Sequence, residues 1–154
     1  ADPEDIRNFL RIDARMTTSG RLQTGDPARL ADIGVRHVIN LALDSHPEAL
    51  PDEQKEMAAA GLRYTHIPIP FDAPTEAHYA ALVEALERDD DPVHIHCIMN
   101  WRVSALLYRY RRDVLGIEEA QARADMERIW NPEEMAARGS EPDVSPWVSI
   151  IAAP

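Results

Sequence analysis

The sequence predicts an α/β domain in which a mostly parallel central sheet is flanked by helices. Residues 37–43 are nearly continuous in apolar side chains, as in a strand covered on both faces, and residues 93–96 form a second short apolar strand. Each strand is followed by a segment of helical character, and this alternation favours a parallel sheet. With 154 residues the chain can bury a substantial core, so we expect residues 1–154 to form a single domain.

The first elements are expected to be a short hairpin and a helix. Residues 1–8 are highly charged and are expected to form a flexible lead-in. Residues 9–12 and 15–18 have the composition of two short strands joined by a tight connection. Asp26 as a cap, followed by Pro27, predicts that a helix begins at this point.

The central part of the chain is expected to alternate strands and helices. The strand at 37–43 is followed by a helix over residues 51–60, which are rich in good helix formers. A strand over 62–69 contains Pro68, which is typical of an edge strand or of a strand end. A helix beginning at Thr75 has one apolar face, formed by Tyr79, Leu82, Val83 and Leu86.

The last part of the chain is expected to be mainly helical. Apolar residues at helical spacing predict a helix from Val103, a second over residues 117–130 and a further turn at 133–136. The tail from Gly139 contains Trp147 and is expected to cover the core as a short helix or coil.

The loop between the strand at 93–96 and the helix from Val103 carries the most specific signal. It has six residues, opens with Cys97, the only cysteine, and closes with Arg102. Backbone N–H groups of such a loop converge, and the following helix directs its positive end to the same point. The sequence therefore predicts an anion-binding site with the thiolate of Cys97 at its base.

This loop resembles that of the cysteine-dependent protein tyrosine phosphatases, in particular a bacterial branch of compact dual-specificity-like proteins. His96, Cys97 and Arg102 match the family's motif, although four residues rather than five separate Cys97 from Arg102. Asn100 occupies the position of a family glycine, and Asn tolerates a left-handed backbone well. The resemblance spans roughly residues 9–130 and includes Thr18-Ser19-Gly20, Val38-Ile39-Asn40-Leu41 and Tyr64-Thr65-His66-Ile67-Pro68.

The resemblance implies the dual-specificity phosphatase architecture and hydrolysis of a phosphomonoester through a phosphocysteine, without a metal or other cofactor. Cys97 would be the nucleophile, and the planar fork of Arg102 would hold two phosphate oxygens. Asp72, on the loop after the third main strand, is the expected general acid, with Glu76 and Asp44 as substitutes.

Other residues of the loop are expected to contact the substrate. Ser104 lies one position beyond the hydroxyl residue that assists departure of the thiolate in the family. The expected substrate-binding residues are Ile98, Met99, Asn100, Trp101, Arg102 and Ser104.

Two alternative functions follow from the shortened loop. A Cys-x4-Arg loop also resembles the active loop of rhodanese-type sulfurtransferases, which predicts sulfur transfer through a Cys97 persulfide. The exchanged residues after Cys97 and Arg102 are also compatible with a catalytically silent module that binds an anion for regulation.

Charge and composition restrict the possible partners. The net charge of −11 argues against nucleic acid and anionic membranes as partners of the surface as a whole. The phosphatase resemblance implies a phosphorylated protein or small molecule as the partner, which local fields inside a pocket would have to attract. No apolar run approaches the roughly 20 residues of a membrane span, and the single cysteine suits a reducing compartment. We therefore expect a cytoplasmic protein, with a mature periplasmic protein as the alternative. His94 and His96 share one strand face, but no further cluster supports a metal site.

Overall fold

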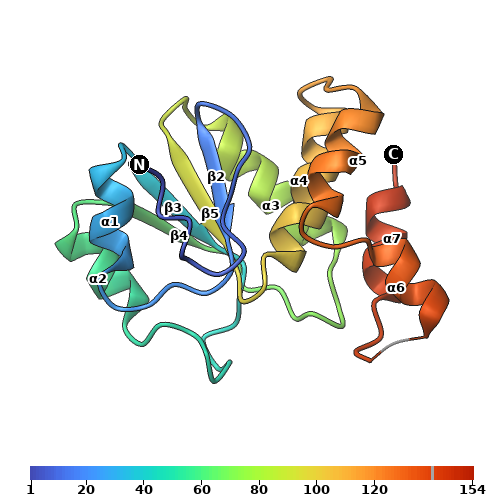
Figure 1. Ribbon diagram of the computed structural model, residues 1–154, viewed down its shortest axis with the longest axis horizontal. Coiled ribbons are helices and arrows are strands. Elements are labelled where there is room, and N and C mark those ends of the chain that lie inside the picture. Colours follow the sequence, from blue (N-terminus) through green and yellow to red (C-terminus); the bar gives the residue numbers. More distant parts are fainter. Residues whose placement is uncertain (140) are drawn as a thin grey trace.

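The computed structural model describes residues 1–139 and 141–154 and contains a central five-stranded sheet (Figure 1). The strands lie in the order β1-β2-β5-β3-β4, so that β4 forms one edge. The pairing of β1 with β2 is antiparallel and all other pairings are parallel. The strands are β1 (Leu10–Arg11), β2 (Met16–Ser19), β3 (His37–Asn40), β4 (Arg63–His66) and β5 (Val93–His96). The prediction of a mostly parallel α/β fold is confirmed, and the expected strand before Pro68 lies at an edge and ends at His66, two residues before this proline.

Helices cover both faces of the sheet, with α1 and α2 on one side and α3 and α4 on the other (Figure 1). The helices are α1 (Asp26–Asp32), α2 (Glu53–Ala59), α3 (Glu76–Glu87), α4 (Trp101–Asp113), α5 (Glu119–Glu127), α6 (Pro132–Arg138) and α7 (Ser145–Ala152). None of the helices in the described ranges combines the length and apolar character that a membrane crossing requires.

Two apolar clusters fill the space between the sheet and its helices. The smaller cluster includes Leu30 of α1 and Met57 of α2, against Val38 of β3. The larger cluster contains Ile39 and Ile95 on the other face of the sheet, together with most of α4. Because α4 is buried along nearly its whole length, its first turn is held rigidly beside the carboxyl end of β5.

The C-terminal tail forms a helix that packs on α4. Trp147 of α7 is fully buried in the larger cluster, and its indole N–H donates to the carbonyl of Phe71 at 2.7 Å. The expectation that the tail covers the core is therefore confirmed, with a short helix as the form it takes.

The N-terminal segment differs from the expected flexible lead-in, because it is packed against the body of the protein. The side chain of Ile6 is only 4% exposed and belongs to the smaller apolar cluster. Its charged neighbours are paired: Asp2 with Arg11 at 2.7 Å, and Arg7 with Glu48 at 2.8 Å. One apolar residue among charges gives no periodic signal, so the sequence analysis missed this docking.

Two helices begin at other positions than expected. Gly25 rather than Asp26 is the N-cap of α1, and the Asp26 carboxylate instead accepts the backbone N–H of Gln23 at 2.7 Å. Helix α4 begins at Trp101, before the expected Val103, because the left-handed Asn100 directs the chain into the helix early. Arg102 is consequently a residue of the first helical turn rather than the last residue of the loop.

Candidate active site

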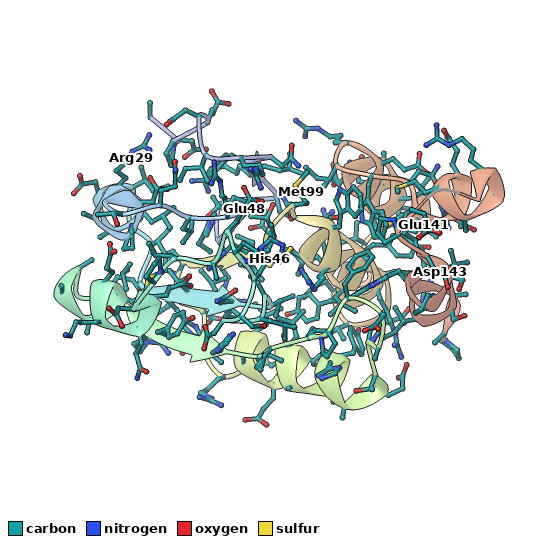
Figure 2. The ribbon with its side chains drawn as sticks, turned by 90° about the horizontal axis from the view of Figure 1, so that it is seen from below. Arg29, His46, Glu48, Met99, Glu141 and Asp143 are labelled. Atoms are coloured by element: carbon teal, nitrogen blue, oxygen red, sulfur yellow. The ribbon has the colours of Figure 1, made fainter. Side chains whose placement is uncertain are left out.

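Three loops meet at the carboxyl edge of the sheet, where parallel α/β domains usually bind ligands. They follow β3, β4 and β5. Figure 2 views the molecule from this side and shows His46, Glu48 and Met99 near one another at its centre. A cavity of about 330 Å³ lies here. It is lined by His46, Phe71, Ile98, Met99, Trp101, Arg102 and Pro142.

Cys97 lies directly after β5 and has no exposed surface. Its N–H donates to the carbonyl of Ser19 at 3.4 Å, which continues the pairing between β5 and β2. The thiol belongs to the larger apolar cluster and is not one of the groups that line the cavity. A ligand in the cavity must therefore approach Cys97 through the turn formed by residues 98–100.

The turn after Cys97 is held by the first hairpin through its carbonyl groups. The Ile98 carbonyl accepts a hydrogen bond from the backbone N–H of Arg21 at 2.9 Å. The Met99 carbonyl accepts one from the side-chain amide of Asn8, also at 2.9 Å. Gly20 passes so close to the Ile98 carbonyl that a Cβ at this position would overlap with its oxygen. The carbonyl groups of the turn are thus directed away from the cavity.

The N–H groups of the same stretch have no such partners. Within the described part of the chain, the six amides of residues 98–103 donate no hydrogen bond. Three of these amides belong to the turn and three to the first turn of α4, whose N-terminus adds a positive field. Consecutive free amides at a helix start are a suitable binding site for a tetrahedral oxyanion.

Asn100 provides the backbone shape that this arrangement needs. Its φ of 67° is left-handed, which confirms the expectation drawn from its position in the motif. Its side-chain amide donates to the carbonyl of Asn8 at 2.9 Å and to the hydroxyl of Thr18 at 3.0 Å. The Asn100 side chain therefore fixes the turn to the hairpin, and only its backbone N–H is free to meet a ligand.

Arg102 is a buried cation that lines the cavity and has no anionic partner. It is 8% exposed, its Nε donates to the carbonyl of Ile69 at 2.9 Å, and its guanidinium lies 5.4 Å from the centre of the Phe71 ring. Among the described residues no carboxylate pairs with it. A buried charge is costly when it is left uncompensated, so this arrangement indicates a site for an anionic ligand.

The three carboxylates considered as general acid have different surroundings. Asp72 is exposed, follows the cavity residue Phe71, and makes no interaction within the described residues. Glu76 is paired with Arg109 at 2.7 Å, and the hydrogen bond with Arg109 lowers the pKa of Glu76. Asp44 lies 3.8 Å from His66. Asp72 is thus the carboxylate of the three that is both free and adjacent to the cavity.

Of two further expected substrate contacts, Trp101 lines the cavity and Ser104 does not. The Ser104 hydroxyl donates to the carbonyl of Trp101 at 3.3 Å, inside the first turn of α4. The Trp101 ring stacks on Trp130, with 4.9 Å between centroids and 4° between planes, and also lines the cavity. Ile98, Met99, Trp101 and Arg102 are thus brought together around one space, while the side chains of Asn100 and Ser104 are directed into local hydrogen bonds.

A buried polar pair beneath Cys97 was not predicted. The Nδ1 atom of His96 lies 3.2 Å from the Cys97 carbonyl oxygen, which can only accept, so Nδ1 carries a proton. The Nε2 atom lies 2.6 Å from the carboxylate of Glu53, and both side chains are less than 5% exposed. Glu53 is 43 residues distant in sequence, and nothing in its helical segment distinguishes it from exposed glutamates.

His94, considered with His96 as a metal ligand, is engaged within the sheet. Its two ring nitrogens lie 2.8 Å from the hydroxyls of Thr17 and Ser19, and its ring stacks on Phe9. Complete burial, with a smaller effect of His96, lowers the pKa of His94 well below its ordinary value. Within residues 1–139 and 141–154, no group of three or more His, Cys, Asp or Glu side chains is arranged to hold a metal ion.

Comparisons with known proteins place the chain among phosphatase-like proteins. A family model for the phosphatase-like domain of beta-lactamase hydrolase-like proteins matches residues 8–108. The beta-lactamase hydrolase-like protein of Xylella fastidiosa (strain Temecula1) is 33% identical over 89 residues, which are 56% of this chain and 21% of that protein. This chain thus matches about a fifth of the length of this curated relative.

Solved structures show the same fold. A putative phosphatase from Shewanella putrefaciens CN-32 aligns with a TM-score of 0.80 and 29% identity, covering 96% of this chain and 90% of that one. TpbA from P. aeruginosa, solved in complex with pTyr, aligns with a TM-score of 0.69 and 20% identity, covering 100% of this chain and 94% of that one. At the latter identity the likeness concerns the fold alone.

Proposed function

The chain belongs to the family of phosphatase-like domains found in beta-lactamase hydrolase-like proteins, a protein tyrosine phosphatase-like family, and we propose that it hydrolyses phosphomonoesters through Cys97. In this proposal the free amides of residues 98–103 and the guanidinium of Arg102 bind the phosphoryl group. The reaction requires no metal ion, because these N–H groups balance the charge of the phosphoryl oxygens.

The reaction proceeds in two displacements at phosphorus. The thiolate of Cys97 attacks phosphorus, the bond to the ester oxygen breaks, and Asp72 gives its proton to the departing alkoxide. The Asp72 carboxylate then takes a proton from a water molecule, which attacks the phosphocysteine. The phosphorus–sulfur bond breaks, inorganic phosphate leaves, and the thiolate is restored.

The observation that carries this proposal is the unpaired charge of Arg102 beside six unused amides. Each of these groups is costly to leave without a partner in a buried place. A dianionic phosphoryl group would satisfy several of them at once, and its phosphorus would then lie next to Cys97. A reducing compartment such as the cytoplasm would keep this one cysteine as the free thiol that attack requires.

The walls of the cavity restrict the alcohol part of the substrate. Phe71, Trp101, Ile98 and Met99 present apolar surface, and none of the described residues that line the space is a carboxylate. A flat or apolar leaving group would gain by burial here, whereas a strongly hydrated sugar would lose hydration. The proposed substrates are therefore phosphomonoesters of aromatic or apolar alcohols, on a protein or on a small molecule.

The test is turnover of p-nitrophenyl phosphate by the wild-type protein and by Cys97→Ser, at about pH 5 to 7.5. We expect turnover by the wild type, loss of activity in the variant, and a phosphate adduct on Cys97 when the wild-type reaction is quenched in acid and the protein analysed by mass spectrometry. Equal rates in the two proteins would refute the role of Cys97.

Complete burial of Cys97 supports a second candidate, a module that binds an anion without turning it over. The two functions differ in a simple way. Binding of inorganic phosphate without turnover of any aryl phosphate, and without an adduct on Cys97, would favour the silent module over the enzyme.

A further inference from the structure

The loop between β3 and α2 brings one more hydrogen-bond donor to the cavity. His46 lies on this loop and lines the same space as Arg102 and Ile98. Figure 2 shows it near Met99, which belongs to the turn after Cys97. Apart from Arg102, it is the only residue among those lining the cavity whose side chain carries a strong N–H donor near the turn, since the Trp101 ring is stacked on Trp130.

The hydrogen bonding of the His46 ring determines which nitrogen is free to donate. The backbone N–H of Glu48 donates to Nδ1 at 3.0 Å. A nitrogen that accepts a hydrogen bond carries no proton, so the neutral ring has its proton on Nε2. In the described part of the chain Nε2 has no hydrogen-bond partner, which leaves this N–H available to a ligand.

Glu48 also holds the loop in place through its carboxylate. Its two oxygens accept hydrogen bonds from the two terminal guanidinium nitrogens of Arg7, at 3.0 and 2.8 Å. One of these oxygens also lies 3.3 Å from a guanidinium nitrogen of Arg21. The hydrogen bonds with Arg7 lower the pKa of Glu48, so the carboxylate stays ionised over the neutral range. The His46 loop is therefore clamped to two cationic residues of the N-terminal region.

The same two arginines contact the turn after Cys97. The backbone N–H of Arg21 donates to the Ile98 carbonyl at 2.9 Å, and a guanidinium nitrogen of Arg7 lies 3.4 Å from the same oxygen. We call Arg7, Arg21 and Glu48 the clamp. It joins the loop that carries His46 to the turn that carries the free amides, so the two sides of the cavity keep a fixed separation.

We propose that His46 is a phosphate-binding residue, whose Nε2–H donates to an oxygen of the bound phosphoryl group, and that the clamp positions it. The proposal deepens the phosphatase function and rests on it for its physiological meaning. Within residues 1–139 and 141–154 no carboxylate lines the cavity to compete for this donor, although the chain carries a net charge of −11. The local donors thus provide the attraction that the overall charge opposes.

The test compares two substitutions that each keep one half of the imidazole. His46→Asn keeps an acceptor for the Glu48 amide but removes the donor, whereas His46→Gln places an amide N–H near the position of Nε2. The dissociation constant of inorganic phosphate is measured by calorimetry on the wild type, both variants and His78→Gln. His78 is the control because it caps α3 and does not line the cavity.

We expect His46→Asn to weaken phosphate binding about tenfold, the usual order for one hydrogen bond to a charged group. His46→Gln should remain within about threefold of the wild type, and Glu48→Gln, which loosens the clamp, should lie between the two. His78→Gln should bind as the wild type does. Thermal melting of each variant verifies that it is folded.

The proposal is overturned if His46→Asn binds phosphate as the wild type does, or if both His46 variants lose affinity equally. Its failure is distinct from that of the phosphatase function. If the protein turns over an aryl phosphate but binds phosphate independently of His46, the phosphatase function stands and the role of His46 is refuted. His46-dependent binding without turnover leaves the inference and removes the enzyme. Absence of phosphate binding by the wild type removes the inference, and the turnover measurement then decides on the enzyme by itself.

Discussion

The two ends of helix α4 bury arginine side chains in different ways. Near the C-terminal end, Arg109 pairs with Glu76 and Arg111 pairs with Asp125, each at 2.7 Å. At the N-terminal end, Arg102 is buried to a similar extent, yet no carboxylate in the described chain compensates its charge. One helix therefore buries arginine in ion pairs near its C-terminal end and without an ion pair at its N-terminal end.

The helix field makes this difference more pronounced. Cations near a C-terminus are favoured by the carbonyl groups there, so the helix field adds to the ion pairs of Arg109 and Arg111. A cation in the first turn is opposed by the N-terminal field, and Arg102 also stands beside free amides. The end that is less favourable for folding is the end that faces the cavity, as expected where stability is given up for binding.

The largest effect should come from Arg102→Lys. A lysine keeps the charge but cannot present two parallel N–H groups to phosphate oxygens, so kcat/KM for an aryl phosphate should fall about a thousandfold. The free energy of unfolding should fall by about 1 kcal/mol, because a lysine loses the hydrogen bond that Nε of Arg102 donates to the carbonyl of Ile69. Arg111→Lys is the control at the other end of the helix, and it should leave kcat/KM within about twofold. A loss of activity in both variants would abolish the distinction between the two ends.

Asp125→Asn tests the C-terminal end of α4, where Arg111 is paired with Asp125. It leaves Arg111 buried with a neutral partner, which should cost about 2 kcal/mol, somewhat less than for a fully buried pair. Urea denaturation measures this loss, and kcat/KM should stay within about twofold of the wild type. Unchanged stability would mean that the Arg111–Asp125 ion pair does not stabilise the fold, so that the two ends of the helix would not differ in this respect.

The smallest expected effect is on the pH dependence of stability, through the ion pair of Glu76 with Arg109. The hydrogen bond with Arg109 holds the pKa of Glu76 below its ordinary value of 4.5, so this pair stabilises the fold above that pH and loses its contribution as the pH falls below it. Because the Glu76 side chain is 66% exposed, the gain is about 0.5 kcal/mol or less. The difference in stability between wild type and Glu76→Gln should shrink on acidification from pH 6. A difference independent of pH would show that Arg109 is held by packing alone.

Local patterns in the sequence were sufficient to predict much of the fold. The apolar strands, the strand end marked by Pro68 and the helix after Cys97 are signals contained within a few residues. All three are found, although the helix begins at Trp101 rather than at Val103. The left-handed Asn100 followed from its place in the motif. The functional roles of Cys97, Arg102 and Asp72 remain proposals, although the structure places all three at or beside the same edge of the sheet.

Other features depend on residues distant in sequence, which no local pattern reveals. The pairing of Arg7 with Glu48 spans 41 residues and that of Glu53 with His96 spans 43. Charged residues in a helix or a terminus are usually solvated, so neither pairing could be distinguished from ordinary surface charge. The docking of residues 1–8 and the place of His46 follow from these pairings and were missed for the same reason.

Gly20 gives the first hairpin an influence over the shape of the turn after Cys97. Since any side chain at this position would occupy the volume of the Ile98 carbonyl oxygen, the two backbones can approach only where the residue is a bare methylene. The separation between the first hairpin and the turn after Cys97 is in this way set by the smallest possible residue. Redesign of the turn after Cys97 for a bulkier anion would have to treat both segments as one unit.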